Sequence, residues 1–208
     1  MYRHLLLARF GLTNLVAVGL LGAAYLQGWL KPVLEADLVE LSGVIAALFL
    51  YGFVRCAAAL WHINRELNDV EAGIPVMGSH ARRYLDTADE VAAGVLRLRL
   101  TNRISIVRQI ANSLVFLGLI GTVIGFIIAL SGVDPEAASD AERIGAIITN
   151  LISGMSVALN TTLVGAVLYV WLIVNHRLLT TGTVSLLTGT LELGQRRGLQ
   201  GGGGHGRA

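Results

Sequence analysis

The sequence contains one cysteine, three prolines and few charged residues, which make up 14% of its 208 residues. A single cysteine, Cys56, excludes an internal disulfide and any CxxC metal or redox motif, and we expect it to be a small buried side chain. The five histidines are scattered, and the sequence has no HExxH motif and no Ser-His-Asp order. We therefore predict no metal site, no cofactor and no catalytic residues, which argues against an enzyme.

Charge is also missing from long stretches, and these define the predicted fold. Three of four apolar segments contain no Asp, Glu, Lys or Arg, and the second has only Arg55, interpreted as a snorkelling side chain near the helix end. Each segment is long enough to cross a bilayer, which takes about 20 helical residues. The sequence thus predicts an all-α integral membrane protein with four transmembrane helices, at about 10–30, 41–61, 111–132 and 144–175.

These spans belong to one predicted membrane domain, 1–192, in which 62–110 forms a cytoplasmic segment. Helical extensions are expected on the cytoplasmic side, since apolar residues recur at helical spacing before the third span and after the fourth. Residues 193–208 are glycine-rich and are predicted to be a flexible cytoplasmic tail. The first apolar segment, with small residues near Gly22 and Ala24, also resembles a cleavable signal peptide, but its 21 uncharged residues exceed the 7–15 of a signal core.

The placement of arginines predicts the orientation. Seven lie between the second and third spans and four follow the last span, whereas the two short loops carry seven acids against Lys31 and Arg143. By the positive-inside rule, both termini and the middle segment are cytoplasmic. Topology alone explains the arginines, so no nucleic-acid partner is expected.

Small residues form stripes on the two central spans. On 111–132 the stripe contains Gly118, Thr122, Gly125, Ala129 and Gly132, and on 144–175 it contains Gly154, Ala158, Thr162, Gly165, Ala166 and Tyr169. Small residues let two membrane helices approach closely. We predict helix packing through Gly118, Gly121, Gly125, Gly154, Ala158 and Gly165.

A second, polar face lies opposite the stripe on the last span. Its residues are Thr149, Ser153, Ser156 and Asn160, spaced along one side of the helix. Two special faces suggest contacts with other subunits or a partner helix on one side and with the chain's own bundle on the other. Alternatively, each hydroxyl only bonds a backbone carbonyl one turn earlier, which has no functional consequence.

Two sequence motifs carry a resemblance to a known family. Leu117–Gly125 resembles the LGLLGTVxG motif of the MotA/TolQ/ExbB proton-channel family, and Ala158–Gly165 resembles its ALxxTxxG motif. The resemblance implies a homo-oligomer, pentameric in the family, in the bacterial inner (cytoplasmic) membrane. It also implies a single-span partner of the MotB/TolR/ExbD type, in two copies. The family's paired threonines map onto Thr122 and Thr162, which the resemblance assigns to the ion pathway.

The predicted spans contain no carboxylate that could bind a proton. The family's partner carries a membrane aspartate, so the resemblance implies an ion-conducting, most simply proton-conducting, subunit of a motor complex driven by the ion-motive force. The alternative is a non-conducting scaffold held together by small-residue helix contacts. Val157 stands where TolQ and ExbB chains have glutamate and Trp171 where they have proline, which leaves the branch open. The sequence does not distinguish protons from sodium ions as the conducted ion. It also leaves open the driven process, which is outer-membrane import, envelope maintenance, motility or defence.

Overall fold

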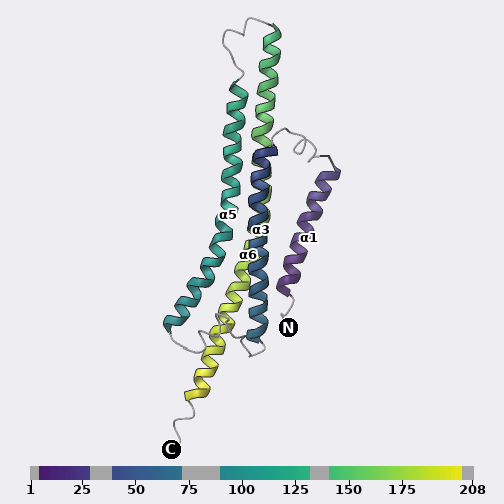
Figure 1. Cartoon of the computed structure of the whole chain (residues 1–208). Helices are drawn as coiled ribbons and strands as arrows, with labels where there is room; N and C mark the ends of the chain where they lie inside the picture. The colour runs from purple at the N-terminus through teal and green to yellow at the C-terminus, as the bar shows by residue number, and fades with distance from the viewer. Residues whose placement is uncertain (1–4, 29–38, 72–89, 132–140, 203–208) are drawn as a thin grey trace, which may run out of the picture. The chain divides into compact units, whose positions relative to one another are not determined.

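The computed structural model describes residues 5–28, 39–71, 90–131 and 141–202, and all the regular structure in these ranges is α-helical (Figure 1). The four helices are α1 (Leu5–Leu26), α3 (Val39–Glu71), α5 (Glu90–Ser131) and α6 (Ala141–Gly202). Each contains a segment long and apolar enough to cross a membrane: Leu6–Leu26, Leu41–Asn68, Gly94–Ser131 and Ile144–Gly194. The prediction of an all-helical chain with four such helices is confirmed.

Two helices extend well beyond the predicted spans. α5 already begins at Glu90 and α6 continues to Gly202, because no proline interrupts either segment. The predicted tail therefore starts too early: 193–202 is helical, and 203–208 lies outside the described residues. The two acidic loops also lie almost entirely outside the described ranges.

The first helix ends earlier than predicted, at Leu26 rather than near Leu30. Gly28 has a φ of 79°, and its N–H donates to the carbonyl of Tyr25 at 3.0 Å. A glycine in this left-handed conformation just after the last helical residues is a common helix C-terminus, since it satisfies carbonyls that have no partner in the helix.

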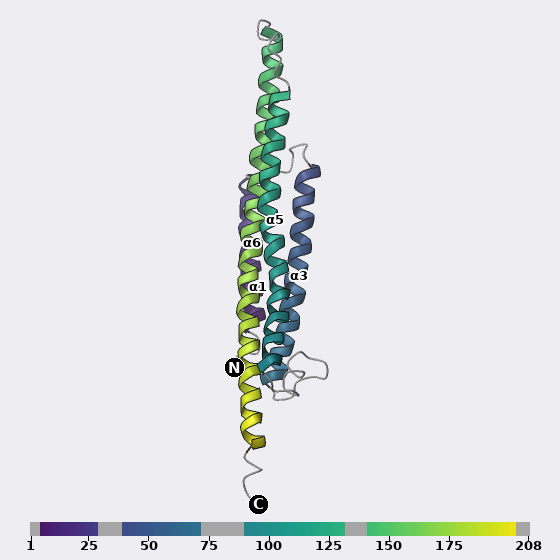
Figure 2. The same cartoon turned by 90° about the vertical axis from the view of Figure 1, so that its left-hand side faces the viewer.

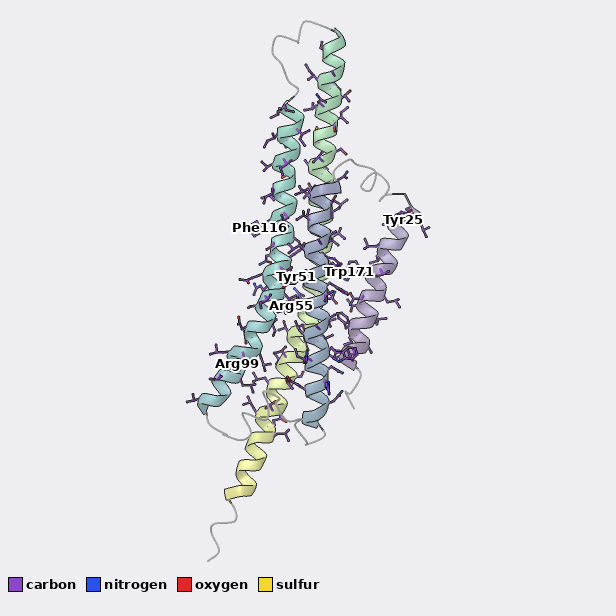
Figure 3. The ribbon with its side chains drawn as sticks, viewed as in Figure 1. Tyr25, Tyr51, Arg55, Arg99, Phe116 and Trp171 are labelled. Carbon is purple, nitrogen blue, oxygen red and sulfur yellow. The ribbon has the colours of Figure 1, made fainter. Side chains whose placement is uncertain are left out.

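The chain divides into two compact units. The first, which we call the hairpin unit, comprises Leu15–Phe53 and Gln109–Ile173. In it α5 and α6 lie side by side in both views and run antiparallel (Figures 1 and 2). The α3 side of the unit packs against α6 through rings: Trp171 lies 5.2 Å from Phe49 and 6.2 Å from Phe53 between centroids (Figure 3).

The second, which we call the terminal unit, comprises Met1–Asn14, Val54–Arg108 and Val174–Ala208. Its buried apolar residues come from α3, α5 and α6: Cys56, Leu60, Ile63, Leu96, Leu100, Val107, Leu179 and Leu186. The start of α1 joins them where Leu6 and Ile63 lie over Gly182 of α6.

Much of the apolar surface of this single chain is open. Phe116 is 65% exposed, Leu119 59% and Phe126 60%, all on α5. A soluble monomer rarely exposes contiguous apolar surface of this extent, whereas lipid or further subunits can cover it.

Candidate functional site

The closest helix contact in the hairpin unit joins α5 to α6 through small residues. A methyl group added to Gly125 would lie 2.6 Å from the backbone nitrogen of Ala158 and from the carbonyl oxygen of Gly154. One added to Gly165 would lie 2.8 Å from the carbonyl oxygen of Leu114. These separations leave no room for a side chain, so the two backbones touch. We call this contact the seam; the structure brings to it Gly118, Gly121, Gly125, Gly154, Ala158 and Gly165.

Two neighbouring threonines of α6 have different environments at the seam. Thr161 is 2% exposed and fills the space beside Gly121, with its hydroxyl donating to the carbonyl of Val157 at 3.0 Å. Thr162 lies at the edge of the seam and is exposed, although its hydroxyl reaches across to α5. The stripe drawn from the sequence included Thr162 and left Thr161 out, whereas the structure buries Thr161 in the seam and leaves Thr162 at its edge. The cause is helical geometry: Thr161 lies closer than Thr162 to the mean direction of Gly154, Ala158 and Gly165.

Thr162 and Thr122 both flank the seam. The Thr162 hydroxyl donates across to the carbonyl oxygen of Gly118 on α5 at 3.2 Å. Gly118 lies one turn before Thr122, whose side chain is half-buried and whose hydroxyl donates to the carbonyl of Leu119 in its own helix. Both hydroxyl hydrogens are therefore engaged by the backbone, while each oxygen retains acceptor capacity.

Uncharged groups, chiefly hydroxyls and side-chain amides, are the polar side chains that this part of the chain offers. No Asp, Glu, Lys, Arg or His occurs in 109–131 or 144–175. Among the described residues there is no group of three His, Cys, Asp or Glu that could hold a metal ion. The seam and its flank can provide shape and hydrogen bonds, but they cannot bind and release a proton by themselves.

The predicted polar second face is on the surface of this chain. Thr149, Ser153 and Ser156 are exposed and Asn160 is half-buried. The Thr149 hydroxyl donates to the carbonyl of Gly145 at 2.9 Å, and the Asn160 amide reaches the Ser156 oxygen at 3.5 Å. Both of these hydrogen bonds lie within α6.

The sequence analysis missed a pair of asparagines in the terminal unit. The Asn14 amide of α1 donates to the side-chain oxygen of Asn175 of α6 at 2.9 Å, and the Asn175 amide donates back at 3.3 Å. Asn175 is 0% exposed. An asparagine inside an apolar helix indicates a hydrogen bond to another part of the bundle, since its amide requires a partner away from water. The identity of that partner could not be deduced from the sequence.

The fold and the site together define a multi-span helical membrane protein whose central helices meet through glycines beside uncharged hydroxyls. The sequence profile of the MotA/TolQ/ExbB proton channel family matches residues 63–188, more than half of the chain. The chain belongs to this family, whose members are channel and transport proteins rather than enzymes. Comparisons with curated proteins and with solved structures give no match.

Proposed function

We propose that this chain is the ion-conducting subunit, carrying protons, of an inner-membrane motor complex that uses the ion-motive force to drive a partner subunit. The family match supports a channel role. The observation that carries the finer proposal is the pair Thr122 and Thr162, which lie beside a tightly packed seam in helix segments, 109–131 and 144–175, without any charge.

The partner follows from what the chain lacks. A proton path through hydrocarbon needs a titratable group, and α5 and α6 have none from 109 to 131 and from 144 to 175. The required carboxylate is then an aspartate on the single membrane helix of a MotB/TolR/ExbD-like subunit. We propose two copies of that helix within a pentamer of this chain, whose exposed apolar residues on α5 would be covered by neighbours and lipid.

The hydroxyls would sense the protonation state of that aspartate. Because the hydrogens of Thr122 and Thr162 are donated to backbone carbonyls, their oxygens are ready to accept a hydrogen bond from a protonated carboxyl group. A deprotonated carboxylate can only accept, so the same hydroxyls would first have to break their backbone bonds. Protonation thus changes the preferred position of the partner helix, which biases its movement.

The arginine distribution supports an orientation with both termini in the cytoplasm of a bacterial cell.

The second candidate function is a non-conducting scaffold. Its support is that the structure gives both threonine hydroxyls a partner within the chain, so neither needs an ion or a second protein.

Threonine-to-valine substitutions distinguish the two candidates, because valine keeps the volume and branching but removes the hydroxyl. In vesicles that contain this chain and its partner, T122V and T162V should each lower ion flux by about tenfold or more, which is roughly the effect of one lost hydrogen bond of 1.4 kcal/mol. Serine at either position should retain part of the flux.

The matched control is T149V, because Thr149 also bonds a backbone carbonyl but lies on the opposite, exposed face of α6. Native mass spectrometry of all variants should show unchanged assembly. Wild-type flux in both T122V and T162V would overturn the hydroxyl pathway and favour the scaffold.

A further inference from the structure

Each of the four helices contributes one exposed arginine to the same part of the terminal unit. We call these residues the arginine belt: Arg9 of α1, Arg55 of α3, Arg108 of α5 and Arg177 of α6. Figure 3 labels Arg55, together with Arg99, which lies nearer the start of α5.

Contacts between the helices place the other three within about one and a half turns of the level of Arg177. Arg9 lies between Leu6, which packs on Gly182, and Asn14, which bonds Asn175. On α6, Arg177 lies between the same two contact points, Asn175 and Gly182. The α1 and α6 arginines are therefore within about one helical turn, roughly 5 Å, of each other along the helix axes.

The other two arginines lie within about one and a half turns, roughly 8 Å, of Arg177 along the helix axes. His176, next to Arg177, lies beside Arg108 and hydrogen-bonds the main chain of Ile104 on α5. On α3, Ile63 packs on Gly182, and Arg55 precedes Ile63 by two turns, about 12 Å. Since α3 and α6 run in the same direction, Arg55 is again within about one turn of Arg177.

The helix segments on either side of the belt contain no acidic residue that would balance its charge. No Asp or Glu occurs in 5–28, 41–65, 91–131 or 144–191. Four guanidinium groups near one level therefore require water or anions around them, because a charged side chain in hydrocarbon costs at least about 2.5–3.5 kcal/mol.

We propose that the arginine belt binds the anionic phospholipid headgroups of the cytoplasmic leaflet and so sets the depth of the subunit in the bilayer. Guanidinium groups match phosphate oxygens with paired hydrogen bonds, and a negatively charged leaflet attracts each arginine near its surface. The inference uses membrane insertion and the orientation proposed above, and it does not depend on ion conduction.

The lengths of the helices agree with a membrane boundary at the belt. Arg9 to Leu26 on α1 is 18 residues and Val39 to Arg55 on α3 is 17, within the range of about 17–25 that a span takes. On α6, however, Thr149 precedes Arg177 by about 42 Å of helix, more than the roughly 30 Å of hydrocarbon. The polar face around Thr149 would then lie outside the hydrocarbon, where its hydroxyls can be hydrated.

Lipid retention tests the proposal. The purified protein and a variant with all four substitutions, R9Q, R55Q, R108Q and R177Q, are reconstituted in phosphatidylcholine mixed with phosphatidylglycerol, then extracted and analysed by native mass spectrometry. Each arginine near an anionic surface contributes about 1 kcal/mol, so each lost arginine should reduce the preference for phosphatidylglycerol by about fivefold. The corresponding arginine-to-lysine variant should retain most of it.

The control is R65Q, which removes an exposed arginine of α3 lying about 15 Å past Arg55 along the helix. That distance exceeds the Debye length of about 8–10 Å at physiological salt, so lipid preference should barely change. Equal phosphatidylglycerol retention by the wild type and the four-glutamine variant would overturn the proposal. The same loss per arginine in R65Q would also overturn it, because it would show a diffuse charge effect. Neither result depends on ion flux, so failure of the proposed function would be seen separately.

Discussion

The seam and the asparagine pair join helices to α6 in opposite ways. At the seam, α5 meets α6 over several turns, and the contact is so close that backbone atoms touch. α1, whose membrane-length segment is 0% buried, is joined to α6 by a reciprocal amide pair and by Leu6 over Gly182. Lipid is as apolar as leucine, so helices in a membrane do not associate by burying apolar surface alone. This chain uses both of the remaining means, close backbone packing and polar pairing.

A substitution at the seam should destabilise the fold more than one at the asparagine pair, because the close backbones leave no space for a bulky side chain. We expect G125L to prevent α5 and α6 from packing, with a cost at or above the upper end of the roughly 1–3 kcal/mol of an overpacked core. The measurement is the fraction of purified protein that has the same assembly state as the wild type in native mass spectrometry.

The matched control is G145L on α6, because a side chain built at Gly145 would meet nothing within 4 Å. It should assemble like the wild type. An unchanged assembly state in G125L would show that the seam can open without loss of the fold.

The asparagine pair should give a smaller effect. N175L leaves the amide of Asn14 without its α6 partner, and interhelical hydrogen bonds in membranes contribute about 0.6–2 kcal/mol. We expect α1 to separate from α6 more often. Cysteines at the neighbouring positions, L6C and G182C in a C56A background, should form a disulfide, and N175L should lower its yield by a few-fold.

A double variant sharpens this test. N14L with N175L removes both polar groups, so no amide is left unpaired, and the cross-linking yield should recover in part relative to N175L alone. A yield in N175L equal to that of its parent would mean that Leu6 and its neighbours hold α1 without the amide pair.

The smallest effect is expected at Thr161, inside the seam. T161V keeps the shape that fills the space beside Gly121 and removes a hydroxyl that bonds only its own helix. Stability should change by less than about 1 kcal/mol, and ion flux should stay at the wild-type level, in contrast to T162V. A loss of flux in T161V as large as in T162V would show that the seam itself, not its flank, carries the ion.

Part of this molecule could be predicted from the sequence alone. The four apolar segments, the absence of charge in 111–132 and in 144–175, and the family motifs around Gly121 and Thr162 are all properties of short stretches of chain. Bilayer thickness converts the length and polarity of such a stretch directly into a spanning helix. Helix ends were less accurate, since the sequence has no strong stop signal near Gly194 and α6 continues to Gly202.

The tertiary structure decided what depends on rotation and register between helices. It buried Thr161 in the seam and left Thr162 at its edge, paired Asn14 with Asn175 across 161 residues of sequence, and brought four arginines from four helices to the same part of the terminal unit. The period of a helix shows which residues share a face but not which face meets a neighbour or at what height. The contacting face and the relative height of two helices are set by packing between segments far apart in the chain, so only the folded bundle determines them.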